Sequence, residues 1–167
     1  MNLAVQNAEL MRVLDEWLLE GRRISLPVNG SSMRPLIPQT GAAVEMIRPD
    51  PCGPATIKRG DILLVRVSEE RFALHRVTAT DSEGVWINGD AQCFVEGQFP
   101  WSAVHGKALG VVIQGRLHSL ERGFYARAGL LWLSLFPVRC VLVRGKRFLS
   151  GLLPCGRGTG VRTGGPT

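Results

Sequence analysis

The sequence predicts a single, mainly β domain with a helix at each end. Short apolar segments recur along the middle of the chain, and turn residues separate them. The 20 glycines and 10 prolines favour such turns, and 45% of the residues are hydrophobic, as a globular core requires. At 167 residues the chain has the length of one domain. We therefore expect a compact antiparallel β core with flanking N- and C-terminal helices.

Residues 1–23 are predicted to be an amphipathic helix. Apolar residues recur at helical spacing between residues 2 and 20, and Gly21 follows as a stop signal. We expect this helix to lie on the core. A helix that lies on a membrane or grips a partner is the alternative, although the acidic residues of its polar side disfavour anionic lipid.

Residues 24–117 are predicted to form the β core. Within it, the runs 62–67 and 71–78 are expected to pair as a hairpin, and residues 94–100 are expected to be a loop. The other expected strands are 24–28, 41–47, 85–87 and 108–117. Their spacing is typical of an antiparallel β domain.

Residues 118–153 are predicted to be a helical extension, with a helix over 119–136 that Pro137 ends. Residues 130–153 mix aromatic side chains with arginine and lysine, as peripheral membrane anchors do. This segment is therefore expected to contact an anionic membrane, with an ordinary core helix and a basic rim as the alternative. The glycine-rich residues 154–167 are expected to be a disordered tail.

Composition and charge exclude several other classes of function. The net charge is +6, but aromatic residues are few, at 7%, so no nucleic-acid partner is expected. The four cysteines form no Cys-x-x-Cys pair, so no metal site and no cofactor are expected. There is no secretory signal, and the most apolar window, 130–143, is too short to cross a membrane. We therefore expect a cytoplasmic protein, with a peripheral position at the inner face of the membrane as a further option.

The candidate nucleophile lies in the turn Asn-Gly-Ser-Ser-Met-Arg-Pro-Leu at residues 29–36. Met33 is expected to pack inward and Pro35 to stiffen the turn, so that one serine projects. Gly30 lets the backbone approach a substrate carbonyl closely. The Ser32 N–H, with a neighbouring N–H or the Ser31 hydroxyl, is then placed to form an oxyanion hole.

A serine needs a neighbouring base, and His75 is the best candidate in this chain. Its imidazole acts as a base near neutral pH without tuning. The alternative is a hydrogen-bonded core histidine, because its neighbours in the strand are apolar. His105 and His118 are expected at turns or on the surface. Asp90, after Asn88-Gly89, is the candidate for orienting the imidazole, and a turn-capping aspartate is the alternative.

Taken in order, these motifs resemble the signal peptidase I family and its S24/S26 serine peptidase relatives. The motifs are Gly-Ser-Ser-Met-Arg-Pro-Leu, Gly60-Asp61, His75-Arg76-Val77 and Gly89-Asp90. The resemblance covers residues 26–112. It implies a mostly β catalytic core, with Ser32 as nucleophile and His75 as the histidine-type base of the archaeal and endoplasmic-reticulum branch. By the same resemblance Asp90 is that branch's acidic residue, and Gly60 and Asp61 form a structural box.

The sequence therefore predicts a serine endopeptidase, a hydrolase that acts on a peptide or protein substrate through a Ser32–His75 dyad or a Ser32–His75–Asp90 triad. The alternative from a different class is a catalytically inactive β scaffold or peptide-binding module of the same fold. A self-cleaving regulator like the LexA-type repressors is disfavoured. No Ala-Gly bond precedes Ser32, and no lysine occupies the position of the base.

Overall fold

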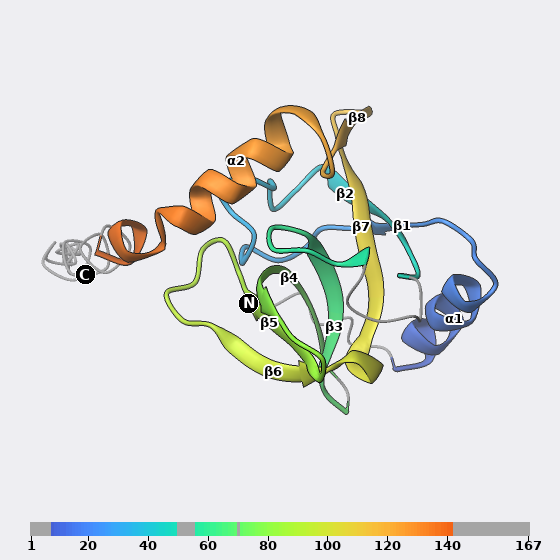
Figure 1. The fold of residues 1–167 in the computed structure, drawn as a ribbon. Coiled ribbons are helices and arrows are strands. Elements are labelled where there is room, and N and C mark those ends of the chain that lie inside the picture. The colour runs from blue at the N-terminus through green and yellow to red at the C-terminus, as the bar shows by residue number, and fades with distance from the viewer. Residues whose placement is uncertain (1–7, 50–55, 70, 142–167) are drawn as a thin grey trace, which may run out of the picture.

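The computed structural model describes residues 8–49, 56–69 and 71–141. It confirms the mainly β fold, because eight strands form one antiparallel sheet (Figure 1). The strands are β1 (Ile24–Pro27), β2 (Ala42–Ile47), β3 (Ile62–Ser68), β4 (Arg71–Thr80), β5 (Gly84–Asn88), β6 (Glu96–Pro100), β7 (Val104–Ile113) and β8 (Arg116–Ser119).

The sheet has the order β1-β2-β7-β3-β4-β5-β6, and β8 pairs with the C-terminal end of β7. The central strand β3 is buried on both faces, which explains the continuous apolar run from Ile62 to Val65. Its alternate residues enter two separate clusters. Ile62 and Leu64 join the larger one, and Leu63 and Val65 join the smaller one. The expected hairpin of residues 62–67 and 71–78 is the β3–β4 pair.

Helix α1 (Ala8–Leu19) packs on the larger cluster, as its predicted periodicity requires. Leu14 and Leu18 are buried there, one helical turn apart. Asp15 also anchors the helix, because its Oδ1 lies 2.8 Å from Nδ1 of His105 on β7. His105 is thus a half-buried packing residue and not the turn or surface residue that its sequence neighbours indicated.

Two strand predictions need correction. Residues 94–100, expected to be a loop, contain the edge strand β6, which tolerates Pro100 because it is the last strand of the sheet. The expected long strand 108–117 is two strands, β7 and β8, joined at Gln114-Gly115. Both of these residues have positive φ, at 51° and 75°, which reverses the chain there.

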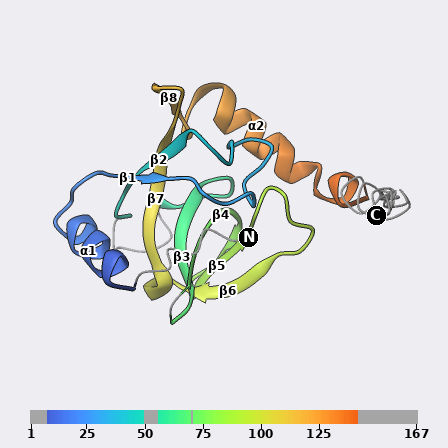
Figure 2. The same ribbon diagram turned by 180° about the vertical axis from the view of Figure 1, so that it is seen from behind.

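Helix α2 (Gly123–Ser134) lies at the opposite end of the molecule from α1, as both views show (Figures 1 and 2). Residues 136–141 are helical again after a break at Leu135. Among the described residues, no helix is both long and apolar enough to cross a bilayer. The cytoplasmic location stays a prediction. The predicted tail at 154–167 lies outside the described residues, as does most of the extension beyond Val141.

Candidate functional site

The serine turn connects β1 to β2 and is closed by its own backbone. The Arg34 N–H donates to the Ser31 carbonyl at 3.2 Å, and the Ile37 N–H donates to the Met33 carbonyl at 3.0 Å. Met33 is 2% exposed and belongs to the larger cluster, as predicted. Ser31 and Ser32 are both half-buried. The buried Met33 side chain therefore anchors the turn that carries the two serines to the core.

A second contact ties Ser32 to the loop that follows β5. The Ala91 N–H donates to the Ser32 carbonyl at 2.7 Å. A Cβ added to Gly89 would lie only 3.0 Å from that carbonyl oxygen, and it would also meet the Gln92 side chain. Glycine at position 89 thus makes room for the Ser32 backbone. The sequence indicated a turn at Asn-Gly-Asp. Residues 88–91 form the support on which the serine turn rests, and we call them the cradle.

The Ser32 N–H remains available as a donor. No described residue accepts a hydrogen bond from it, while the Ser32 carbonyl is engaged by Ala91. A backbone N–H held in this way can stabilise a developing oxyanion without reorganising. The prediction that Ser32 contributes an oxyanion donor is thus compatible with the geometry of the turn.

His75 lies on β4, beside the cradle. His75 lies opposite Leu63 in the β3–β4 pair, and Leu63 belongs to the smaller cluster. Residues opposite each other in antiparallel strands project to the same face of the sheet. The imidazole therefore projects to the face of the smaller cluster, whereas Met33 of the serine turn belongs to the larger one. The link between the two is Asp90, whose charge acts on the pKa of His75 and whose neighbour Ala91 binds Ser32.

The imidazole itself is buried and makes no hydrogen bond within the described part of the chain. His75 is 1% exposed, and neither Nδ1 nor Nε2 makes a hydrogen bond with any described residue, Ser32 included. Burial lowers the pKa of His75 below its usual 6.5, and the nearby charge of Arg71 adds to this. Glu96 and Asp90 act in the opposite direction. Desolvation dominates, so the ring is neutral, and able to take up a proton, at neutral pH.

Among the described residues, the acid that pairs with the imidazole is Glu96, which the sequence did not indicate. Its Oε1 lies 3.4 Å from Nδ1 of His75, and it comes from the edge strand β6. The residue was hidden because Gly97 and Pro100 made this segment look like a loop. A carboxylate at this distance favours the protonated ring, and so would stabilise an imidazolium if one formed.

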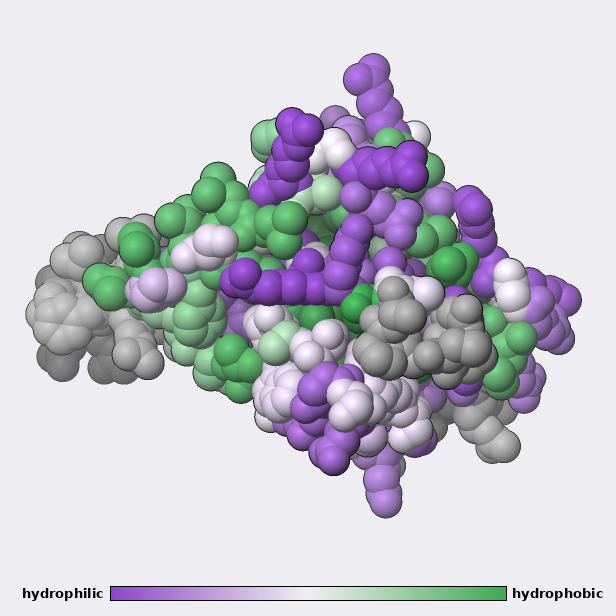
Figure 3. Space-filling model, in the orientation of Figure 1, coloured by the Kyte–Doolittle hydropathy of each residue, from purple (hydrophilic) through white to green (hydrophobic). Residues whose placement is uncertain are grey.

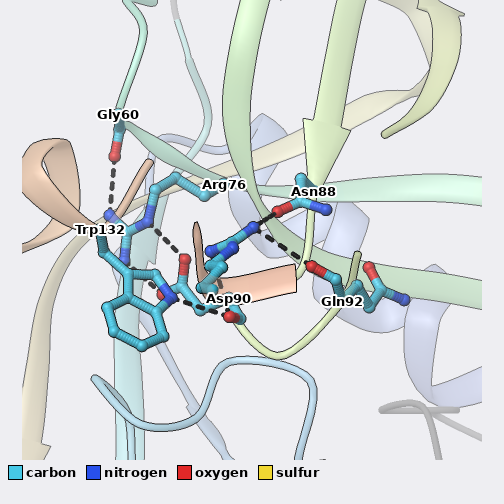
Figure 4. A network of polar contacts seen from close by, with 7 residues as sticks. Gly60, Arg76, Asn88, Asp90, Gln92 and Trp132 are labelled. Carbon is cyan, nitrogen blue, oxygen red and sulfur yellow. Dashed lines mark hydrogen bonds and ion pairs between the residues drawn. The ribbon is translucent and has the colours of Figure 1, made fainter. Parts of the chain in front are cut away.

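Asp90 has a different partner from the predicted one. Nε of Arg76 donates to Oδ1 of Asp90 at 2.9 Å, and Nη2 donates to Oδ2 at 2.7 Å (Figure 4). Both carboxylate oxygens are therefore held by the guanidinium in a bidentate pair. The expectation that Asp90 hydrogen-bonds and orients His75 is corrected accordingly. The burial of Arg76, at 2% exposed, explains the pairing, because a buried cation needs a counter-charge.

The C-terminal helices complete this network, in a way the sequence did not indicate. Nε1 of Trp132 donates to the Asp90 carbonyl at 2.8 Å (Figure 4). Nη1 of Arg139 donates to the same oxygen at 3.1 Å. Arg139 also binds the side chain of Asn88 and the carbonyl of Gln92. Arg139 is 2% exposed. An arginine inside an apolar window was the available signal, because a buried guanidinium requires acceptors.

Gly60 and Asp61 support the start of β3. Gly60 has a φ of +99°, and its carbonyl accepts a hydrogen bond from Nη1 of Arg76 at 2.9 Å. Asp61 accepts a hydrogen bond from the Lys58 N–H at 2.9 Å and lies 3.1 Å from Nζ of Lys107. These contacts are structural in kind, and they connect the Gly-Asp turn to the Arg76–Asp90 pair.

Comparison of the chain with protein-family models, with curated proteins and with solved structures gave no match. The resemblance to signal peptidases therefore stays a prediction from the motifs. Within the described residues, no three His, Cys, Asp or Glu side chains are grouped as metal ligands. The structure joins the serine turn to the cradle after β5, and it places Glu96 beside a buried, neutral His75.

Proposed function

We propose that the protein is a serine endopeptidase in which Ser32 is the nucleophile and His75 is the general base. Two observations support the proposal. The Ser32 carbonyl is fixed by Ala91, and the buried, neutral imidazole of His75 makes no hydrogen bond with a described residue while Asp90, the neighbour of Ala91, acts on its pKa. A buried imidazole without a hydrogen-bond partner costs free energy, so its retention needs an explanation. Proton transfer to and from a substrate-bound serine supplies one.

The reaction has two halves. His75 takes the Ser32 hydroxyl proton while Oγ forms a bond to the substrate carbonyl carbon, and the Ser32 N–H stabilises the oxyanion. The imidazolium then gives that proton to the leaving amine as the peptide bond breaks. Water, deprotonated by the same ring, hydrolyses the acyl-enzyme. Glu96 stabilises the imidazolium that forms in each half, the role first expected of Asp90.

Asp90 takes a positioning role in this proposal. Its side chain is fixed by Arg76 and its carbonyl by Trp132 and Arg139, and the following residue, Ala91, binds Ser32. The hydrogen bonds of Asp90 therefore fix the loop whose Ala91 holds the serine turn in place. In structures without substrate, catalytic hydrogen bonds are often long, and they tighten when substrate binds. The absence of a Ser32–His75 hydrogen bond is compatible with that behaviour.

A second candidate function is a catalytically inactive β scaffold that binds peptides. The lack of a hydrogen bond between either ring nitrogen of His75 and the Ser32 hydroxyl favours this second function. The two functions differ in whether the Ser32 hydroxyl matters for peptide-bond cleavage.

Incubation of the purified chain with a diverse peptide library, with products read by mass spectrometry, separates the two. Ser32→Ala should lower cleavage by roughly 10³-fold or more, as removal of a serine nucleophile does. Ser82→Ala is the matched control, since it removes an exposed serine hydroxyl in the turn between β4 and β5, and it should keep the activity. Equal cleavage by wild type and Ser32→Ala would reject the peptidase, and no cleavage by either would favour the scaffold.

A further inference from the structure

An exposed apolar stripe runs along the face of α2 that shares a hollow with Leu36. Phe124 is 76% exposed, Leu131 is 62% exposed and Leu135 is 40% exposed, and their spacing of seven and four residues puts them on one helix face. Val138, in the helical segment after the break, is 55% exposed as well. Figure 3 shows hydrophobic residues gathered at the end of the molecule where α2 lies.

The stripe borders a hollow of about 620 Å³ between α2 and the serine turn. Leu36, four residues after Ser32, contributes from the turn. The helix contributes Phe124, Arg127, Leu131 and Trp132, among others. The lining is predominantly apolar, and among the described residues that form it Arg127 is the one with a charge.

The charge of the chain is segregated toward the same end. All 14 acidic residues lie at or before Glu121, so α2 and everything after it contain none. From residue 122 onward the sequence holds Arg122, Arg127, Arg139, Arg144, Lys146, Arg147, Arg157 and Arg162. Arg122 and Arg127 are exposed at the start of α2. The apolar stripe therefore belongs to a part of the chain that is uniformly cationic.

We propose that this face of α2, with Leu36, docks on an anionic lipid bilayer, with the stripe inserted at the level of the headgroups. An apolar helix face flanked by arginine and free of acidic residues fits such a surface. A second copy of the chain fits less well, because pairing the two faces would bring like charges together. The helix has 12 residues and lies on the bilayer without spanning it. Bound in this way, the protein holds the turn that carries Ser32 beside the membrane surface.

The proposal is tested by cosedimentation of the full chain with vesicles. Vesicles of phosphatidylcholine mixed with phosphatidylglycerol should bind the protein, and phosphatidylcholine alone should bind it at least about tenfold more weakly. Phe124→Ser with Leu131→Ser should reduce binding to the anionic vesicles by about tenfold or more, since two inserted side chains are lost. Arg122→Glu with Arg127→Glu should do the same, and added salt should weaken the binding of wild type.

Matched controls come from the opposite end of the molecule, where α1 lies (Figures 1 and 2). Leu19→Ser removes a side chain that is 60% exposed, and Arg23→Glu reverses an exposed charge. Both should bind vesicles like wild type. The proposal is overturned if the Phe124/Leu131 variant binds as wild type does, or if neutral vesicles bind equally well. It is also overturned if sedimentation shows a dimer that this variant abolishes, because a second copy then covers the face. None of these outcomes depends on peptidase activity.

Discussion

Replacing Asp90 with alanine should destabilise the fold by about 3–5 kcal/mol, the usual cost of leaving one partner of a buried ion pair uncompensated. Arg76 and Asp90 are 2% and 1% exposed, so water cannot replace the lost carboxylate. Nε and Nη2 of Arg76 would each lose their carboxylate acceptor. Among the described residues, the Arg76 side chain would keep only the hydrogen bond from Nη1 to the Gly60 carbonyl. The guanidinium would then be a buried cation with no carboxylate.

The double variant Arg76→Leu with Asp90→Ala provides the internal comparison. Removing both charges avoids the uncompensated cation, so the double variant should cost less than the sum of the single variants by about 0.5–3 kcal/mol. Glu83→Ala is the matched control for losing an acidic side chain, because Glu83 is exposed, and it should stay within about 0.5 kcal/mol of wild type.

The measurement is urea denaturation followed by tryptophan fluorescence, with the midpoint and the slope fitted separately. A lower midpoint at unchanged slope gives the loss of stability directly. If Asp90→Ala costs less than about 1 kcal/mol, or if the single and double variants are additive, the pair does not carry the charge compensation assigned to it.

Three further predictions concern His75, Glu96 and Gly129. Because burial lowers the pKa of His75, the unfolded chain binds a proton below about pH 6.5 while the folded chain does not, so the free energy of unfolding should fall as pH drops from about 6.5 toward 5. His75 contributes at most about 1.4 kcal/mol per pH unit to this change in the free energy of unfolding. Urea denaturation of His75→Gln at several pH values should show no such contribution. Glu96→Gln removes a charge that raises the pKa of His75, so the acidic limb of the kcat/KM–pH profile should move to lower pH. If the limb does not move, Glu96 does not influence the protonation of His75. Gly129→Ala should destabilise by thermal unfolding, although alanine normally gains about 1 kcal/mol over glycine in a helix, because its Cβ would lie 2.8 Å from Cζ of Arg76; a raised melting temperature would contradict this packing.

The sequence was sufficient for the fold class and for most of the strands, because these depend on local patterns. The apolar run of β3 and the turn residues after β5 indicated a sheet, and Met33 indicated which side of the serine turn is buried. The strand β6 was missed because glycine and proline normally signal a loop, and only its edge position makes them acceptable.

The partners of the site residues were harder to predict, because they depend on contacts distant in sequence. Asp90 was assigned to His75 from its place after a turn, but its side chain pairs with Arg76, 14 residues earlier. Arg139 reaches Asp90 across 49 residues, and no local pattern encodes that contact. A charged residue inside an apolar run does predict that some counter-group is buried with it. It does not predict which one.

Labelling with a fluorophosphonate probe tests the central claim most directly, because the probe forms a covalent bond only with an activated serine hydroxyl. Wild type and Ser31→Ala should each gain a single adduct, and tryptic peptide mapping of the wild-type adduct should place it on Ser32. His75→Gln should label much more slowly, and Ser32→Ala should not label at all. An adduct at another residue, or equal labelling of wild type and Ser32→Ala, would contradict the assignment of Ser32 as a nucleophile.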